Sequence, residues 1–186
     1  MKRITLAIIA FATFTTTMNA QEKNVSTTES KINWKGYKVG GSHEGTIALK
    51  SGVLTFDNDV LTGGTFTIDM TSINTTDLTG EYKDKLDGHL KSDDFFGVAT
   101  YPSAKIVFTS VKPTDKTTYK VTGDLTIKGN TNPVTFDLSL EGDNAKATLK
   151  IDRSKYNVRY GSKSFFDNLK DNVIYDEFDI IADLKL

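Results

Sequence analysis

Two histidines and a pair of adjacent carboxylates are the side chains of this sequence best suited to metal or acid–base chemistry. His43 and His89 are the only histidines among the 186 residues, and Asp93 and Asp94 follow His89 closely. Imidazole and carboxylate groups suit zinc, but the spacing of these four residues is not that of a metal site. Adjacent carboxylates usually point apart, whereas acid–base catalysis needs two of them aimed at one bond. We therefore predict no metal site and interpret these residues as hydrogen-bonding groups of loops and helix ends.

Nucleophilic catalysis has even less support in the sequence. The chain contains no Cys, no Gly-x-Ser-x-Gly segment and no phosphate-binding loop. We predict that the protein is not an enzyme and uses no cofactor. The alternative hypothesis is a hydrolase or isomerase that acts on an apolar substrate, with His89 working beside Asp93 or Asp94.

Arg153 and Arg159 are the only two arginines beyond the first few residues. A guanidinium group can donate two parallel hydrogen bonds to a phosphate or carboxylate group. Arg153 and Arg159, together with His89, are therefore candidate contacts for the polar head of a ligand. The alternative is that both arginines form ion pairs with neighbouring aspartates on the surface.

The elements that position these residues are predicted to be strands. Apolar and polar side chains alternate through most of the chain, which places one set on each face of a strand. The clearest alternating segments are 65–70, 119–128, 134–141, 145–152 and 178–185, and weaker ones are 32–39, 46–50, 53–56 and 104–111. The short turns between them require antiparallel neighbours, because a parallel connection needs a dozen or more residues.

We therefore predict an all-β fold in which about eight strands form an antiparallel up-and-down barrel. Closing the sheet removes the edges that would otherwise promote aggregation. A two-sheet sandwich is the alternative that fits the same pattern. Apolar residues recur at helical spacing in Thr79–Leu90 and Ser162–Leu169, which indicates one or two short helices or structured loops.

The inward faces of the predicted strands are the candidate binding surface. A barrel of about eight strands is just wide enough to be filled by side chains or to hold one elongated ligand. Small residues such as Gly36, Ala104 and Ala182 share these faces with large ones, so composition leaves a cavity and a filled core both open. The candidate lining residues are Phe66, Ile68, Phe108, Val121, Gly123, Leu125, Phe136, Leu138, Ala147, Leu149, Phe178 and Ile180.

The first 20 residues are predicted to be a secretory signal peptide. Lys2 and Arg3 precede an apolar stretch from Ile4 to Phe14, and a small residue, Ala20, ends the polar segment that follows. Cleavage after Ala20 would leave 166 of the 186 residues, with 21 basic and 24 acidic side chains. This pattern predicts a periplasmic or secreted protein.

Composition limits what the rest of the chain can bind. The chain is 38% hydrophobic and 25% charged, as in folded domains, and its net charge of −1 gives no excess of cations for nucleic acid. The sequence contains no run of about 20 apolar residues, so we predict no permanent membrane anchor. We predict a flexible polar segment over residues 21–30 and one barrel domain over residues 31–186.

Five further segments carry a pattern that is more specific than alternation. They are 63–73 (GGTFTIDMTSI), 89–96 (HLKSDDFF), 101–106 (YPSAKI), 121–129 (VTGDLTIKG) and 151–156 (IDRSKY). In this order they resemble the YceI-like family of secreted barrels that bind polyisoprenoid lipids. The resemblance implies a lipocalin-like antiparallel barrel whose interior takes a long apolar chain, without a catalytic motif.

These observations together predict a lipid-binding protein that sequesters or transports a polyisoprenoid or similar apolar ligand inside its barrel. We predict no nucleic-acid partner, and the sequence leaves a homodimer open. The remaining alternative is a stress-related structural barrel that has a filled core and binds no ligand.

Overall fold

The computed structural model describes residues 20–186, which contain nine strands, one α-helix and two short 3-10 helices joined by turns and loops. The elements are β1 (Ala20–Asn24), β2 (Ser26–Lys38), β3 (Gly41–Asp57), β4 (Val60–Thr75), α1 (Gly80–Lys91), β5 (Ser103–Pro113), β6 (Thr118–Ile127), β7 (Asn130–Glu141), β8 (Asn144–Asp152), η1 (Arg153–Tyr156), η2 (Lys170–Asn172) and β9 (Ile174–Lys185). Apart from Ala20, the predicted signal peptide lies outside the described residues.

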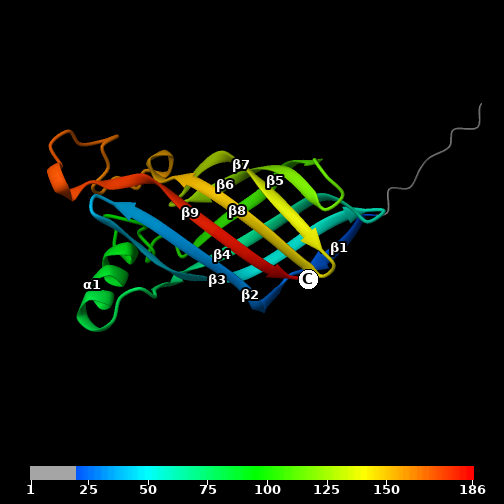
Figure 1. The fold of residues 1–186 in the computed structure, drawn as a ribbon, viewed down its shortest axis with the longest axis horizontal. Coiled ribbons are helices and arrows are strands. Elements are labelled where there is room, and N and C mark those ends of the chain that lie inside the picture. The colour runs from blue at the N-terminus through cyan, green and yellow to red at the C-terminus, as the bar shows by residue number, and fades with distance from the viewer. Residues whose placement is uncertain (1–19) are drawn as a thin grey trace, which may run out of the picture.

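The antiparallel sheet closes on itself to form a barrel (Figure 1). Each strand from β4 to β8 pairs with the next strand along the chain, β9 pairs with β2, and β3 pairs with both β2 and β4. This circuit contains eight strands, which confirms the predicted barrel and excludes the two-sheet sandwich. The short strand β1 pairs with β3 outside the circuit.

Residues 21–30, for which we predicted a flexible segment, occupy β1 and the beginning of β2. Gln21 lies opposite Phe56 on β3, and Val25, between the two strands, is buried. Because β3 extends beyond its pairing with β2, it provides backbone hydrogen-bond partners for this polar segment. Weak hydropathy alternation gave no sign of this pairing in the sequence.

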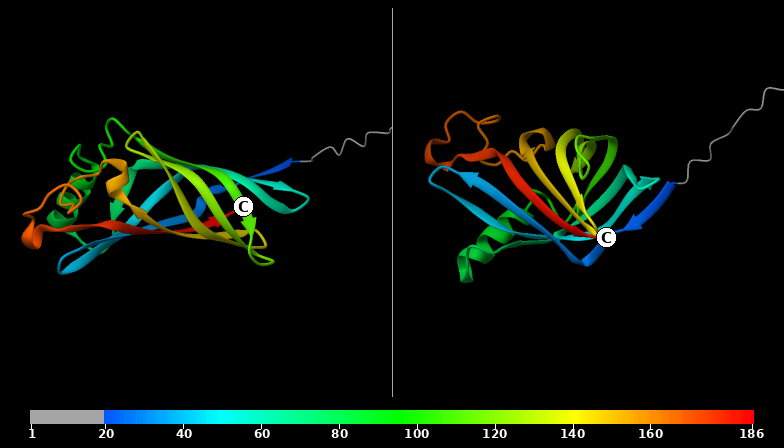
Figure 2. Two further views of the ribbon diagram at one scale, coloured as in Figure 1. Left: turned by 90° about the horizontal axis from the view of Figure 1, so that it is seen from above. Right: turned by 45° about the vertical axis from the view of Figure 1, so that its right-hand side comes forward.

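The two ends of the barrel are built differently (Figure 2). Helix α1, the β2–β3 hairpin and residues 157–173 lie at one end, which we call the helix end and which is on the left of Figure 1. The ring centroids of His89 on α1 and Tyr160 are 4.4 Å apart, and the Val39 N–H donates to the Val173 carbonyl at 3.0 Å. The opposite end carries the β3–β4 hairpin, β1 and the C-terminus, and we call it the far end.

The two segments predicted as short helices or structured loops have different outcomes. Gly80–Lys91 forms α1, within one residue of the predicted Thr79–Leu90. Ser162–Leu169 forms turns instead, in which the Ser162 carbonyl accepts hydrogen bonds from the N–H groups of Phe165 (3.2 Å) and Phe166 (3.1 Å). This segment is therefore a structured loop at the helix end.

Bulges change which residues face inward along single strands. Leu49 and Phe56 on β3 are both buried, although strict alternation would place them on opposite faces. The register of β3 with β4 shifts between Leu49 and Ser51, and such a shift turns the following side chains to the other face. A similar shift on β5, between Phe108 and Ser110, lies opposite Gly123.

Gly45 on β3 provides a test of this packing, because no side chain fits there. A Cβ atom at Gly45 would clash with the Asn74 carbonyl oxygen and would lie 2.6 Å from the Trp34 ring. We expect Gly45→Ala to lower the free energy of unfolding by about 1–3 kcal/mol or more, measured by urea unfolding. The control is Gly36→Ala, since a Cβ there meets nothing within 4 Å. Equal losses in the two variants would contradict this description of the packing.

Candidate functional site

An apolar cavity of about 190 Å³ occupies the interior of the barrel. A single buried water needs only about 10–15 Å³, so this space is more than ten times larger. Side chains from every strand of the eight-strand circuit line it, together with residues in and after α1. The cavity answers the question that composition left open: the barrel core is not filled.

The polar side-chain groups of Trp34 and Tyr37 in the cavity wall are already paired with other protein groups. Trp34 Nε1 donates to the Thr46 carbonyl at 3.2 Å, and the Tyr37 hydroxyl donates to Asp179 at 2.6 Å. Hydrogen bonding to Tyr37 lowers the pKa of the Asp179 carboxyl group, so this acceptor stays ionised at neutral pH. The wall therefore presents hydrocarbon to whatever enters the cavity.

Ten of the twelve residues predicted to line a cavity do so. They are Phe66, Ile68, Phe108, Leu125, Phe136, Leu138, Ala147, Leu149, Phe178 and Ile180. Phe108 packs against both Phe66 and Phe136, with 5.7 Å between ring centroids in each pair. These three rings form an aromatic cluster on the wall, and alternation along single strands was enough to find them.

The other two predicted residues, Val121 and Gly123, do not line the cavity. Val121 is fully buried among packed side chains, where it lies opposite Val111 and Phe136. A Cβ at Gly123 would lie 3.0 Å from the Val107 carbonyl oxygen, because the bulge in β5 brings the two backbones close together. Gly123 is therefore a position of close strand contact rather than an open wall.

The sequence interpretation did not find the lining residues near the helix end. Most of these residues belong to strand ends or to the segment after α1, where alternation gives no signal. They include Tyr37, Leu90, Phe95, Phe96, Ile174 and Tyr175. The Phe95-Phe96 pair belongs to one of the five family-like segments, which was the only available sign of a role.

The cavity reaches the protein surface at the helix end. Tyr175 is the only lining residue in the described part of the chain that is exposed, with 51% of its surface accessible. The pairing of β2 with β9 is irregular here, because three residues of β9 separate the partners of Gly36 and Lys38. We call this region around Tyr175 the mouth of the cavity.

The far end, in contrast, is packed with side chains that do not line the cavity. Leu54 and Phe56 on β3, Leu61 on β4 and Tyr119 on β6 are between 0% and 6% exposed. Strand β1 and Val25 cover the same end. The far end of the barrel is therefore closed by packed side chains.

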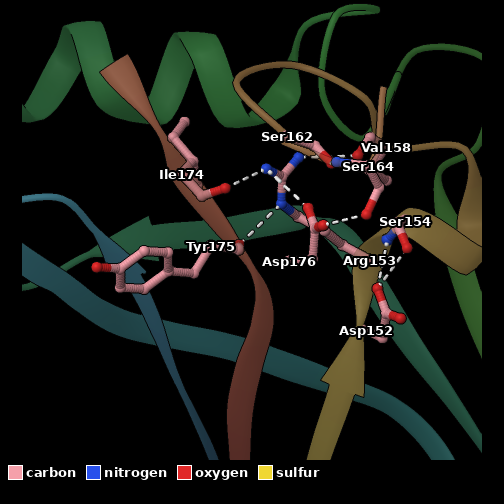
Figure 3. Close-up of polar contacts among 9 residues, drawn as sticks. All are labelled: Asp152, Arg153, Ser154, Val158, Ser162, Ser164, Ile174, Tyr175 and Asp176. Atoms are coloured by element: carbon pink, nitrogen blue, oxygen red, sulfur yellow. Dashed lines mark hydrogen bonds and ion pairs between the residues drawn. The ribbon is translucent and has the colours of Figure 1, made fainter. Parts of the chain in front are cut away.

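Arg153 is almost fully buried beside the mouth, at 2% exposure, and also lines the cavity. Its guanidinium donates to the carbonyl oxygens of Val158 (2.8 Å), Ile174 (2.9 Å) and Tyr175 (3.1 Å), as Figure 3 shows. Asp176 Oδ1 lies 3.5 Å from Nη2. Burial lowers the pKa of Arg153 and Asp176 opposes that change, so the group stays charged as arginine does in proteins. Arg153 thus joins the 157–173 loop to β9 rather than pointing at a ligand.

The other two predicted head-group contacts lie at the helix end but do not line the cavity. His89 packs between Tyr160 and Phe95, with centroid distances of 4.4 and 5.4 Å. Burial lowers the pKa of its imidazole, and the Asp94 carboxylate opposes this effect. Arg159 is exposed and stacks over the Phe165 ring at 4.6 Å.

Within residues 20–186, no helix is long and apolar enough to cross a membrane. The site is thus defined by a closed antiparallel barrel, an apolar cavity and a single mouth beside a buried arginine. This is the architecture of a small-molecule binding barrel.

The profile of the YceI-like domain family matches residues 23–186, and the chain belongs to this family. A UPF0312 protein from Pseudomonas putida (strain W619) is 36% identical over 113 residues. The match covers 60% of this chain and 57% of that relative, so the alignment spans little more than half of the relative's length.

Solved structures share the fold. BcnA from Burkholderia cenocepacia is 27% identical, with a TM-score of 0.67 over 86% of this chain and 98% of that one. A polyisoprenoid binding domain from Saccharophagus degradans is 16% identical, with a TM-score of 0.59 over 90% of this chain and 97% of that one. At this low identity, the second likeness shows the fold alone.

The buried position of Arg153 predicts a large effect on stability. We expect Arg153→Met to lower the free energy of unfolding by about 3–5 kcal/mol, because Asp176 and three carbonyl oxygens lose their donor. Urea unfolding measures the loss, and hydrogen exchange should rise in residues 157–176. The matched control is Arg159→Met, whose exposed cation–π contact is worth only about 0.5–1 kcal/mol. Similar losses in both variants would show that Arg153 does not hold this region together.

Proposed function

We propose that this protein binds a long apolar chain of the polyisoprenoid type inside its barrel and sequesters or transports it. The observation that carries the proposal is the cavity, which has a hydrocarbon wall, a packed far end and one mouth. Moving apolar surface from water into such a space is favourable by roughly 25 cal/mol per Å². No covalent step is needed, and we propose binding without catalysis.

The wall also indicates which chemical groups can enter. Trp34, Tyr37 and Arg153 already use their polar groups within the protein, and a charged group buried without a partner is strongly disfavoured. The buried part of the ligand is therefore hydrocarbon, and any polar head stays at the mouth near Tyr175. Arg153 is not available to bind a phosphate head in this arrangement.

Family membership and the name of one fold relative support the same ligand class. The Saccharophagus degradans domain is described as polyisoprenoid binding, and it has the same barrel fold. The predicted signal peptide supports action in the periplasm or outside the cell. N-terminal sequencing of exported protein tests this part, with Gln21 as the expected first residue.

Direct binding can be measured with a built-in probe. Trp34 is the only tryptophan in the sequence and lines the cavity. A long-chain polyprenol added to the purified protein should therefore change Trp34 fluorescence in a saturable way. Mass spectrometry of solvent extracts from freshly purified protein identifies the natural ligand. A structural barrel without a ligand would show neither signal.

Filling the cavity should separate binding from folding. Ala147 lines the wall on β8, between Leu138 and Ala182 on the neighbouring strands. We expect Ala147→Phe to reduce polyprenol affinity about tenfold or more, a loss of about 1.4 kcal/mol, because the ring occupies ligand space. The melting temperature should change by only a few degrees, since the cavity accommodates the ring.

The control for this experiment is Thr148→Phe. Thr148 is the next residue on the same strand, and it is exposed on the outer face of the barrel. This variant should retain wild-type polyprenol affinity. If Ala147→Phe lost stability by about 1–3 kcal/mol and the wild type bound no polyprenol, the barrel would be a packed core and the proposal would fail.

A further inference from the structure

In the part of the chain that the structure describes, the exposed aromatic residues are all at one end of the barrel. Across residues 20–186, five aromatic side chains are exposed, and each belongs to the helix end, on α1, the 157–173 loop or the adjoining ends of β5 and β9. They are Tyr82, Tyr101, Tyr160, Phe166 and Tyr175. The other large apolar residues exposed away from this end, Val60, Val107 and Ile181, are aliphatic.

This aromatic surface surrounds the mouth of the cavity. Tyr175 belongs both to the surface and to the cavity wall. Tyr160 contacts His89 on α1, and the β2–β3 hairpin is joined to the loop by the hydrogen bond between Val39 and Val173. The three elements therefore form one continuous rim, which Figures 1 and 2 show at the same end of the barrel.

The side chains of the rim match the chemistry of a bilayer surface. Tyrosine rings with an apolar body and a polar tip favour the membrane–water interface. Exposed apolar patches on a folded protein mark interaction sites, whereas single exposed residues need no explanation. Tyr82 is 76% exposed and Phe166 is 47% exposed, so both rings are free to enter the interface.

The 157–173 loop adds positive charge to the rim. Arg159, Lys163 and Lys170 are exposed, and within the described residues none of them forms an ion pair. The loop holds two acidic residues, Asp167 and Asp171, so its own net charge is +1. The rest of the rim is not positive, because α1 carries three lysines and three acidic residues and is followed by Asp93 and Asp94. The cations of the loop are attracted to anionic lipid head groups.

We infer that the rim of the mouth docks on a lipid bilayer that contains anionic lipids. The inference rests on the proposed function, because a polyisoprenoid ligand resides in membranes and must cross from the bilayer into the cavity. Docking places the mouth against the bilayer, so the apolar chain moves between the two without passing through water. The surface binds reversibly through side chains alone.

Flotation with lipid vesicles tests the docking surface directly. Purified exported protein is mixed with vesicles of phosphatidylethanolamine and phosphatidylglycerol, or of phosphatidylcholine alone, both without polyisoprenoid. We expect binding to the anionic vesicles, and weaker binding as salt shortens the Debye length from about 30 Å at 0.01 M to about 10 Å at 0.1 M. The wild type and every variant are prepared in the same way and share one N-terminus, so differences in vesicle binding report on the substituted residues.

Paired variants locate the surface. Tyr82→Ser with Phe166→Ser, and separately Lys163→Glu with Lys170→Glu, should each weaken vesicle binding about tenfold or more. The apolar control is Val60→Ser with Val107→Ser. The charge control is Lys112→Glu with Lys116→Glu, which lie at the far end around the β5–β6 turn. If rim and control variants bound vesicles equally well, the inference would be overturned.

Further measurements separate membrane docking from polyprenol uptake and from self-association of the protein. Ala147→Phe should dock like the wild type while taking up little polyprenol, which would show that docking does not depend on ligand uptake. Wild type that takes up polyprenol from detergent but ignores vesicles would overturn docking and leave the proposed function intact. Wild type that docks but never takes up polyprenol would instead defeat the proposed function. A dimer that the rim variants dissociate, without vesicle binding, would make the rim a self-association surface and overturn the inference.

Discussion

Closure of the sheet through β3 is the constraint on which the rest of the structure depends. This strand of 17 residues pairs with β4 along most of its length, with β2 near its start and with β1 near its end. Because the circuit is closed, the inward side chains face one another, and nearly all of those that line the cavity are apolar. The bulge after Leu49 then turns Leu54 and Phe56 into the far end, which they fill. One strand thus closes the barrel and also limits the depth of its cavity.

The helix end follows from a second constraint, the cost of burying the charge of Arg153. A guanidinium removed from water needs acceptors on its N–H groups, and here three backbone carbonyls and Asp176 supply them (Figure 3). Those carbonyls come from the 157–173 loop and from the start of β9. The loop is therefore held in one shape at the rim, although few of its residues are in regular secondary structure. Phe95, 5.3 Å beneath the guanidinium, joins this network to the cavity wall.

The sequence was sufficient to predict the barrel fold and most of the predicted lining residues. Alternation of apolar and polar residues is a local property of each strand, so it can be recognised without knowing the rest of the fold. Ile68 and Leu149 line the cavity as their strand patterns predict. Val121 and Gly123 do not, since their surroundings depend on a bulge in another strand, β5, and on how densely the far end is packed. The structural role of Arg153 could not be predicted from the sequence either. Its type predicted a head-group contact, whereas its acceptors are main-chain atoms from distant residues that no side-chain pattern reveals.

A cavity with one mouth has a consequence for how a membrane lipid could be exchanged. Each CH₂ group of an apolar chain that passes into water costs about 0.8 kcal/mol, so release through water becomes slower with every isoprene unit. Transfer between bilayer and cavity exchanges one hydrocarbon environment for another and avoids most of this cost. The direction of transfer would then depend on lipid concentrations on either side rather than on a change in the protein. A rigid barrel is sufficient for this task, provided that its single opening and its exposed aromatic rings face the same way.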